Sequence, residues 1–166
     1  MQRTVGLLHP GSMGASVGAA AARSHEVLWC PEGRSAVTQQ RADDAGLRAT
    51  SFAELCARSE ILLSVCPPAE AVPVATSVRE QGFAGLYVDA NAISGERVRE
   101  VAAALASPDV TFVDGGIIGP PAWRPGSTRL YLSGERADDV AELFASTALD
   151  AVVINGDIGT ASALKM

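Results

Sequence analysis

A glycine-rich turn near the start of the chain is the first candidate for chemistry. The apolar run Thr4–Leu8 leads into His9-Pro-Gly-Ser-Met-Gly14, and an alanine-rich helical segment follows. A strand, a glycine turn and a helix in this order suit a dinucleotide, because the turn and the helix N-terminus hold its pyrophosphate. Gly11 and Gly14 take the second and third positions of G-x-G-x-x-G, and His9 stands at the first. By itself, this incomplete motif is weak evidence.

The residues of this turn are the candidates for contact with the cofactor. Four of them are expected to bind the pyrophosphate, namely Gly11, Ser12, Met13 and Gly14. His9 and Pro10 are further candidates, and the alternative for His9 is that its ring only packs at the turn.

The residues after the second predicted strand bear on the choice between NADP and NAD. At this position an Asp or Glu binds a free ribose 2′-hydroxyl, whereas a nearby Arg accommodates a 2′-phosphate. Here the strand ends at Cys30, and Glu32, Arg34 and Ser35 follow. The guanidinium of Arg34 can bind a phosphate through two parallel hydrogen bonds. Glu32, in contrast, favours a free ribose. The alternative for Arg34 is that it is a solvated surface residue without a role in binding. We therefore expect NADP, with Arg34 and Ser35 at the 2′-phosphate and NAD as the alternative.

Other polar or glycine-rich segments come at the ends of later predicted strands. These are Cys66–Pro68, Asp89–Asn91 and Asp114–Gly119. Ligands of doubly wound sheets sit beyond the carboxyl ends of the strands, so these segments are expected to converge on one site. The following loop, Gly115–Gly126, either lines a substrate pocket with Trp123 or is a surface excursion that packs on another domain.

Apolar runs of strand length alternate with helical segments along the whole chain. The predicted strands are 4–8, 25–30, 61–65, 85–89, 110–113, 128–132 and 151–154. The predicted helices are 15–23, 35–45, 51–59, 69–80, one that Ser94 caps, and 137–146, with Ser51 as a second N-cap. This alternation predicts an α/β fold, a Rossmann-like, doubly wound and mainly parallel sheet with helices on both faces.

Composition narrows the class of protein further. A chain of 166 residues with 48% hydrophobic and 19% charged residues is typical of one globular domain. Its net charge of −6 argues against nucleic acid or an anionic membrane as partner. No apolar run approaches the roughly 18 residues of a membrane span, and no signal peptide is evident, so a cytoplasmic protein is expected. The two histidines lie far apart and the three cysteines have no C-x-x-C spacing, so no metal site is predicted.

Five segments resemble motifs of the β-hydroxyacid dehydrogenases, a family that includes 3-hydroxyisobutyrate and 6-phosphogluconate dehydrogenases and, as relatives, the imine reductases. His9–Gly14 is similar to the family's G-x-G-x-M-G, and Val65–Pro68 to a segment that lies against the cofactor. Asp89–Ser94 is similar to D-x-S-T-x-s. Asp114–Pro120 is similar to D-A-P-V-S-G-G, and Gly159–Lys165 to G-x-G-x-x-x-K, which carries the catalytic lysine. The resemblance covers nearly the whole chain.

The resemblance implies an NAD(P)-dependent dehydrogenase or reductase that moves a hydride to or from a hydroxyl/carbonyl or amine/imine carbon of a small molecule. It implies Lys165 as the general acid/base and Asn91 as a catalytic residue that orients the substrate or the lysine. Cofactor contacts are expected from Cys66, Pro67 and Asn91, and substrate contacts from Gly116, Ile117, Ile118 and Gly119.

The resemblance also implies a domain organisation. Residues 1–158 are expected to form the NAD(P)-binding domain, and 159–166 to begin an inter-domain helix. A helical C-terminal domain, absent from these residues, is expected to complete the site and to form a homodimer.

Two departures from the family pattern bear on the substrate. Ile118 replaces a serine that holds the hydroxyacid in relatives, and Asn91-Ala92 replaces the S-T pair. Asn91 can still donate and accept hydrogen bonds, but Ile118 cannot. The pattern indicates a divergent branch of the family. The alternative function is a non-catalytic nucleotide-binding or sensing module that keeps the cofactor site, although the retained Lys165 and Asn91 argue against it.

Overall fold

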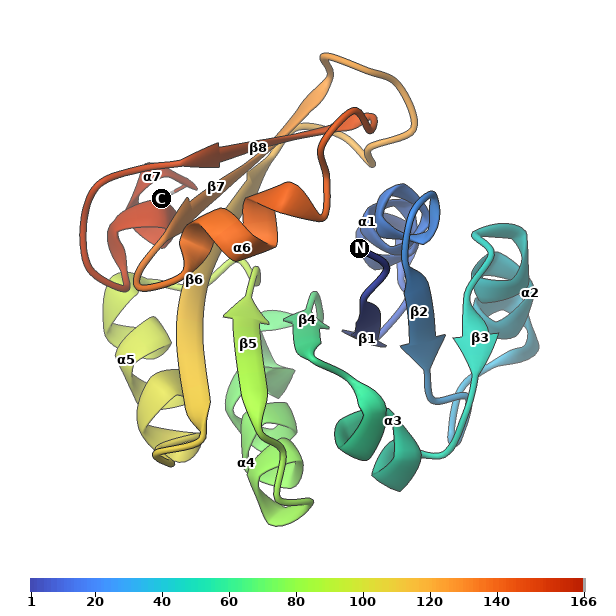
Figure 1. Ribbon diagram of the computed structural model, residues 1–166, viewed down its shortest axis with the longest axis horizontal. Helices are drawn as coiled ribbons and strands as arrows, with labels where there is room; N and C mark the ends of the chain where they lie inside the picture. The colour runs from blue at the N-terminus through green and yellow to red at the C-terminus, as the bar shows by residue number, and fades with distance from the viewer. Residues whose placement is uncertain (166) are drawn as a thin grey trace.

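A mainly parallel, eight-stranded sheet forms the centre of the computed structural model, which describes residues 1–165. Within these residues the strand order is β3-β2-β1-β4-β5-β6-β7-β8, and only the β6–β7 pair is antiparallel. The bounds are β1 (Thr4–Leu8), β2 (Glu26–Trp29), β3 (Arg48–Ala49), β4 (Ile61–Ser64), β5 (Gly85–Asp89), β6 (Val110–Ile118), β7 (Thr128–Ser133) and β8 (Leu149–Val153). The predicted Rossmann-like fold is confirmed, and β3 and β8 are the two edge strands, which Figure 1 shows at the right and across the top of the molecule.

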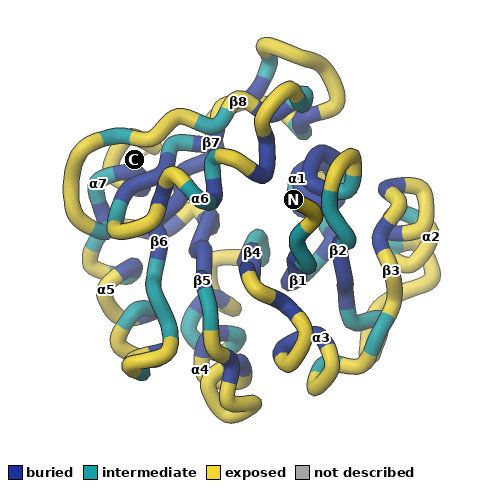
Figure 2. The backbone as a smooth tube through the Cα atoms, in the orientation of Figure 1, coloured by how far each residue is buried: buried dark blue, intermediate teal, exposed yellow. Residues whose placement is uncertain are grey.

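Helices cover both faces of the sheet. They are α1 (Ser12–Ala22), α2 (Ala36–Asp44), α3 (Phe52–Arg58), η1 (a 3-10 helix, Pro68–Glu70), α4 (Ala71–Glu80), α5 (Gly95–Ala104), α6 (Ala137–Glu142) and α7 (Thr160–Lys165). One apolar core packs α1, α2 and α6 against the sheet, and a second packs α3, α4 and α5. Adjacent residues of one strand serve the two cores, as Leu63 and Leu62 do, because side chains alternate along a strand. Figure 2 shows the resulting buried strands and the largely exposed α2.

Serine caps and strand positions follow the predictions closely. The hydroxyl oxygens of Ser51 and Ser94 accept bonds of 3.2 Å from the backbone N–H groups of Glu54 and Arg97. Within residues 1–165, no helix is long and apolar enough to cross a membrane.

The structure corrects the predicted course of several segments. Residues 115–118, predicted as loop, continue β6 and pair with β7, so the loop begins only at Gly119. The short strand β3 was not predicted, because its two residues are exposed and carry no apolar pattern. Helix α1 begins earlier than predicted, at Ser12, and α6 ends earlier, at Glu142.

Helix α7 lies directly on the backbone of β6. A Cβ atom added to Gly116 would come within 2.6 Å of the Ala161 carbonyl oxygen. This contact requires glycine, because any side chain at position 116 would push α7 away from the sheet. The predicted helix at 159–166 is therefore present over Thr160–Lys165, while Met166 lies outside the described residues.

Candidate functional site

The candidate site lies where the strand order reverses. The chain passes from β1 to β2 on one side, and β4 then returns to pair with β1 on the other. In such sheets the crevice beyond the carboxyl ends of these two strands is the ligand site. His9 follows β1, and Val65 follows β4. The N–H of Val65 donates to the Leu8 carbonyl oxygen at 3.3 Å. The predicted cofactor segments thus meet at this edge.

The glycine turn brings α1 close to the end of β1. The Gly11 N–H donates to the His9 carbonyl oxygen at 3.0 Å, and a Cβ on Gly14 would lie only 2.4 Å from that same oxygen. Gly11 is the N-cap of α1 and provides no side-chain cap. The first-turn N–H groups of Ser12 and Met13 have no intrahelical acceptor and are suited to an anion. The turn therefore fits a pyrophosphate.

His9 adopts the backbone conformation usually reserved for glycine. Its φ angle is +77°, and its Nδ1 atom lies 2.8 Å from Nη1 of Arg34. Partial burial, and then the positive charges of Arg34 and Arg41, lower the pKa of the His9 imidazole. His9, at the first position of the glycine turn, is thus in direct contact with Arg34, which follows β2.

A cavity of about 310 Å³ opens beyond the end of β2. It is lined by Cys30, Glu32, Arg34, Phe52 and Glu70 among others, so both competing signals for the ribose face the same space. Ser35 caps α2, where its hydroxyl oxygen accepts from the Thr38 N–H at 3.2 Å. Arg34 and Ser35 thus lie beside this cavity and at the start of α2, and their contacts with a cofactor stay a prediction.

Asn91 joins the ends of β4 and β5. Its side chain is buried and donates to Ser64 Oγ and to Asp89 Oδ2, each at 3.1 Å. Its Oδ1 atom accepts from the backbone N–H of Cys66 at 2.6 Å. Asn91 therefore fixes the backbone at Cys66, which the exposed Pro67 follows. Asp89 belongs to a predicted strand-end segment but had no role of its own, and Ser64 was not predicted, because a buried polar cluster has no spacing that sequence alone reveals.

Asp89 is a buried carboxylate of this cluster. Burial raises its pKa from 3.8 to about 6, and the nearby Asp114 adds to the rise, although the bonds from Asn91 oppose it. Between these two values the folded state binds more protons than the unfolded chain, so this group makes stability fall as the pH rises. We expect Asp89→Asn to flatten the decrease in unfolding free energy between pH 4 and 6.

The measurement is urea unfolding across this pH range, with the exposed Asp109→Asn as the matched control. An unchanged slope in Asp89→Asn would show that Asp89 has an ordinary pKa.

Asp114 anchors the start of α7. Its Oδ2 atom accepts from the N–H groups of Gly159 at 2.8 Å and Ser162 at 2.9 Å, and its Oδ1 accepts from the Ser162 hydroxyl at 2.5 Å. Beside it on β7, Ser133 Oγ accepts from the Ala161 N–H at 3.0 Å. The helix that carries Lys165 is therefore tied to the middle of β6 and to the end of β7. Sequence reasoning assigned no role to Asp114 itself.

Lys165 ends the described part of α7 and is exposed. Partial burial lowers the pKa of its ammonium group. Among the hydrogen bonds of residues 1–165, none joins Lys165 to Asn91. Of the predicted substrate residues, Gly116 and Ile117 are buried in the sheet, whereas Ile118 and Gly119 are exposed.

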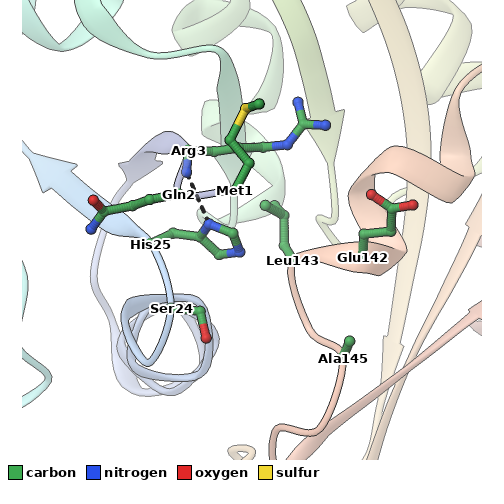
Figure 3. Close-up of a pocket in the computed structure, with 8 residues that line it drawn as sticks. All are labelled: Met1, Gln2, Arg3, Ser24, His25, Glu142, Leu143 and Ala145. Carbon is green, nitrogen blue, oxygen red and sulfur yellow. Dashed lines mark hydrogen bonds between the residues drawn. The ribbon is translucent and has the colours of Figure 1, made fainter.

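A second cavity lies at the opposite end of the central strands, beside the residues that precede β1 and β2. It has a volume of about 340 Å³ and is lined by Arg3, His25 and Leu143 among others (Figure 3). The Arg3 N–H donates to His25 Nδ1 at 3.1 Å there. No predicted site residue lines this cavity. Across the described chain, no group of three or more His, Cys, Asp and Glu side chains is placed to hold a metal ion.

Solved structures share this fold over nearly the whole chain. The conserved protein MTH1747, of unknown function and described as similar to 3-hydroxyacid dehydrogenases, has 29% identity and a TM-score of 0.86, covering 98% of this chain and 61% of its own. Mycobacterium tuberculosis 3-hydroxyisobutyrate dehydrogenase with L-serine has 20% identity and a TM-score of 0.83, covering 99% and 58%. Aspergillus terreus reductive aminase with NADPH and ethyl levulinate has 16% identity and a TM-score of 0.77, covering 99% and 59%.

The chain thus spans about three fifths of the length of these relatives. The sequence matches no protein-family model and no curated protein.

Proposed function

We propose that this chain is the cofactor-binding part of an NADP-dependent oxidoreductase. Its structural neighbours are 3-hydroxyacid dehydrogenase-like N-terminal domains, in agreement with its sequence motifs. The observation that carries the proposal is the convergence of the glycine turn and the Arg34 segment at the switch point of the sheet. The likeness to MTH1747 supports the family, and the dehydrogenase and aminase structures support the fold.

The cofactor would lie across the carboxyl ends of the central strands. The N–H groups at the start of α1 would hold the pyrophosphate, and the cavity lined by Phe52 would receive the adenosine. Arg34 and Ser35 would hold the 2′-phosphate, since a guanidinium matches phosphate geometry. Cys66, whose backbone Asn91 fixes, would lie against the other half of the cofactor.

The reaction would join hydride and proton transfer at one carbon–heteroatom bond. A nicotinamide supplies the hydride to the carbon when it is bound. Lys165 would give the proton to the substrate oxygen or nitrogen in reduction and take it back in oxidation, and its lowered pKa supports this exchange. Asn91 would act as a positioning residue, because its side chain is committed to Ser64, Asp89 and Cys66. We further propose that a helical domain completes the substrate pocket beside Ile118 and Gly119 and forms a homodimer.

A cofactor titration tests the proposal directly. We expect the natural protein to bind NADPH more tightly than NADH. Arg34→Leu is expected to weaken NADPH binding by roughly 10- to 100-fold, because one charge-assisted bond to the phosphate is lost. NADH affinity should stay unchanged. Isothermal calorimetry measures both, with the exposed Arg23→Leu as the matched control. Equal losses for the two dinucleotides would contradict the role of Arg34.

A non-catalytic nucleotide-binding module is the second candidate function. Two observations favour it, since Asn91 has its side chain engaged within the protein and Ile118 has no group to hold a substrate hydroxyl. A screen of carbonyl and imine substrates with NADPH separates the two candidates. NADPH binding without turnover of any substrate would favour the module.

A further inference from the structure

The contact between His9 and Arg34 determines which nitrogen of the histidine carries the proton. A guanidinium is always protonated and only donates, so Nδ1 of His9, 2.8 Å from Arg34 Nη1, must accept. A doubly protonated ring would place an N–H against the guanidinium, which this distance forbids. His9 is therefore neutral with its proton on Nε2, in agreement with the lowered pKa of its ring.

The remaining nitrogen of His9 faces the phosphate-binding turn. A Cβ atom built on Gly11 would lie 3.3 Å from both Nε2 and Cδ2 of His9, so this edge of the ring lies over Gly11. Gly11 is the N-cap of α1, where the pyrophosphate would bind. The Nε2–H donor therefore lies beside the same turn as the free backbone N–H groups.

We infer that His9 is a specificity-determining residue for the cofactor, which holds Arg34 for the 2′-phosphate through Nδ1 and donates from Nε2–H to the pyrophosphate. This inference rests on the proposed function, because it assumes that a dinucleotide binds at the turn. It explains why a residue with a φ angle of +77° is present where glycine would avoid strain. The histidine links two phosphate-binding points that lie 25 residues apart in the sequence.

Replacing His9 with glycine tests both bonds in a protein that should still fold. Glycine adopts this φ angle freely, so we expect the urea midpoint of His9→Gly to stay the same or rise. NADPH binding should weaken by roughly tenfold, the equivalent of one lost bond of about 1.4 kcal/mol, and NADH binding by a smaller factor. Should His9→Gly be unfolded, His9→Asn serves instead, because asparagine tolerates positive φ.

A double-mutant cycle with Arg34→Leu isolates the linkage. In the Arg34→Leu background, His9→Gly should weaken NADPH and NADH binding equally, since no guanidinium remains to be held. An unchanged NADPH-to-NADH ratio in His9→Gly alone would overturn the link to Arg34. Unchanged NADH affinity would overturn the pyrophosphate bond. If the natural protein binds neither dinucleotide, the proposed function itself fails, which is a distinct result.

Discussion

Replacing Lys165 with alanine is expected to lower turnover by roughly 100- to 10,000-fold, the usual contribution of a positioned general acid/base. It is the one lysine among the 166 residues, so no other lysine of this chain can substitute for it. The affinity for NADPH should stay unchanged, because Lys165 lies on α7 and the proposed phosphate contacts lie on the first turn of α1 and after β2. Steady-state kinetics and cofactor titration on the natural protein measure the two effects separately.

Two further variants complete this test of Lys165. Lys165→Arg keeps the charge but should remain slow, because a guanidinium does not release its proton near neutral pH. Leu164→Ala removes an exposed side chain from the same turn of α7 and should leave turnover close to natural. Full turnover in Lys165→Ala would exclude the proposed proton transfer. In that case, the role of α7 in the site would be structural only.

Replacing Asp114 with alanine is expected to destabilise the fold by about 3 kcal/mol or more, since each buried donor left without an acceptor costs about 1–3 kcal/mol. Four donors lose their acceptor in this variant, namely the N–H groups of Gly159 and Ser162 and the hydroxyls of Ser162 and Ser133. Their loss should release the start of α7 from the sheet. Urea unfolding measures the stability, and hydrogen exchange at the Ala163 N–H, which donates to the Gly159 carbonyl oxygen, reports on the helix.

Asp114→Asn and Ser162→Ala are expected to cause smaller losses of stability than Asp114→Ala. Asparagine keeps the size and one acceptor oxygen, so it should lose less stability than alanine does. Ser162→Ala removes a single hydroxyl and should lose about 1 kcal/mol. Equal stability of Asp114→Ala and the natural protein would mean that water replaces the carboxylate. In that case the buried network would not be what holds α7.

Local patterns were enough to predict most of the fold. The apolar run of β1, the glycine turn and the serine caps at Ser51 and Ser94 depend on neighbours within a few residues, and the structure confirms each of them. The continuation of β6 through residues 115–118 was missed, because two glycines suggested a loop while β7 supplies the actual pairing. That pairing depends on a partner strand that no local pattern identifies.

The internal bonds of the site lay beyond prediction for a related reason. Asn91 and Arg34 follow the ends of β5 and β2, but their partners Ser64 and His9 lie 27 and 25 residues away. Only the folded sheet brings such residues together. Periodicity along the chain carries no information about which buried polar groups will satisfy one another.

The anchoring of α7 by Asp114 has a consequence for synthesis of the protein on the ribosome. Asp114 is made before its donors at Gly159 and Ser162, which follow 45 and 48 residues later. At roughly 5–20 residues per second, this interval lasts on the order of two to ten seconds. During that time the nascent domain has β6 available but lacks the helix that covers its backbone at Gly116. This edge of the sheet can therefore complete its folding only some seconds after β6 has been synthesised. During this interval a chaperone or a protease would meet the chain.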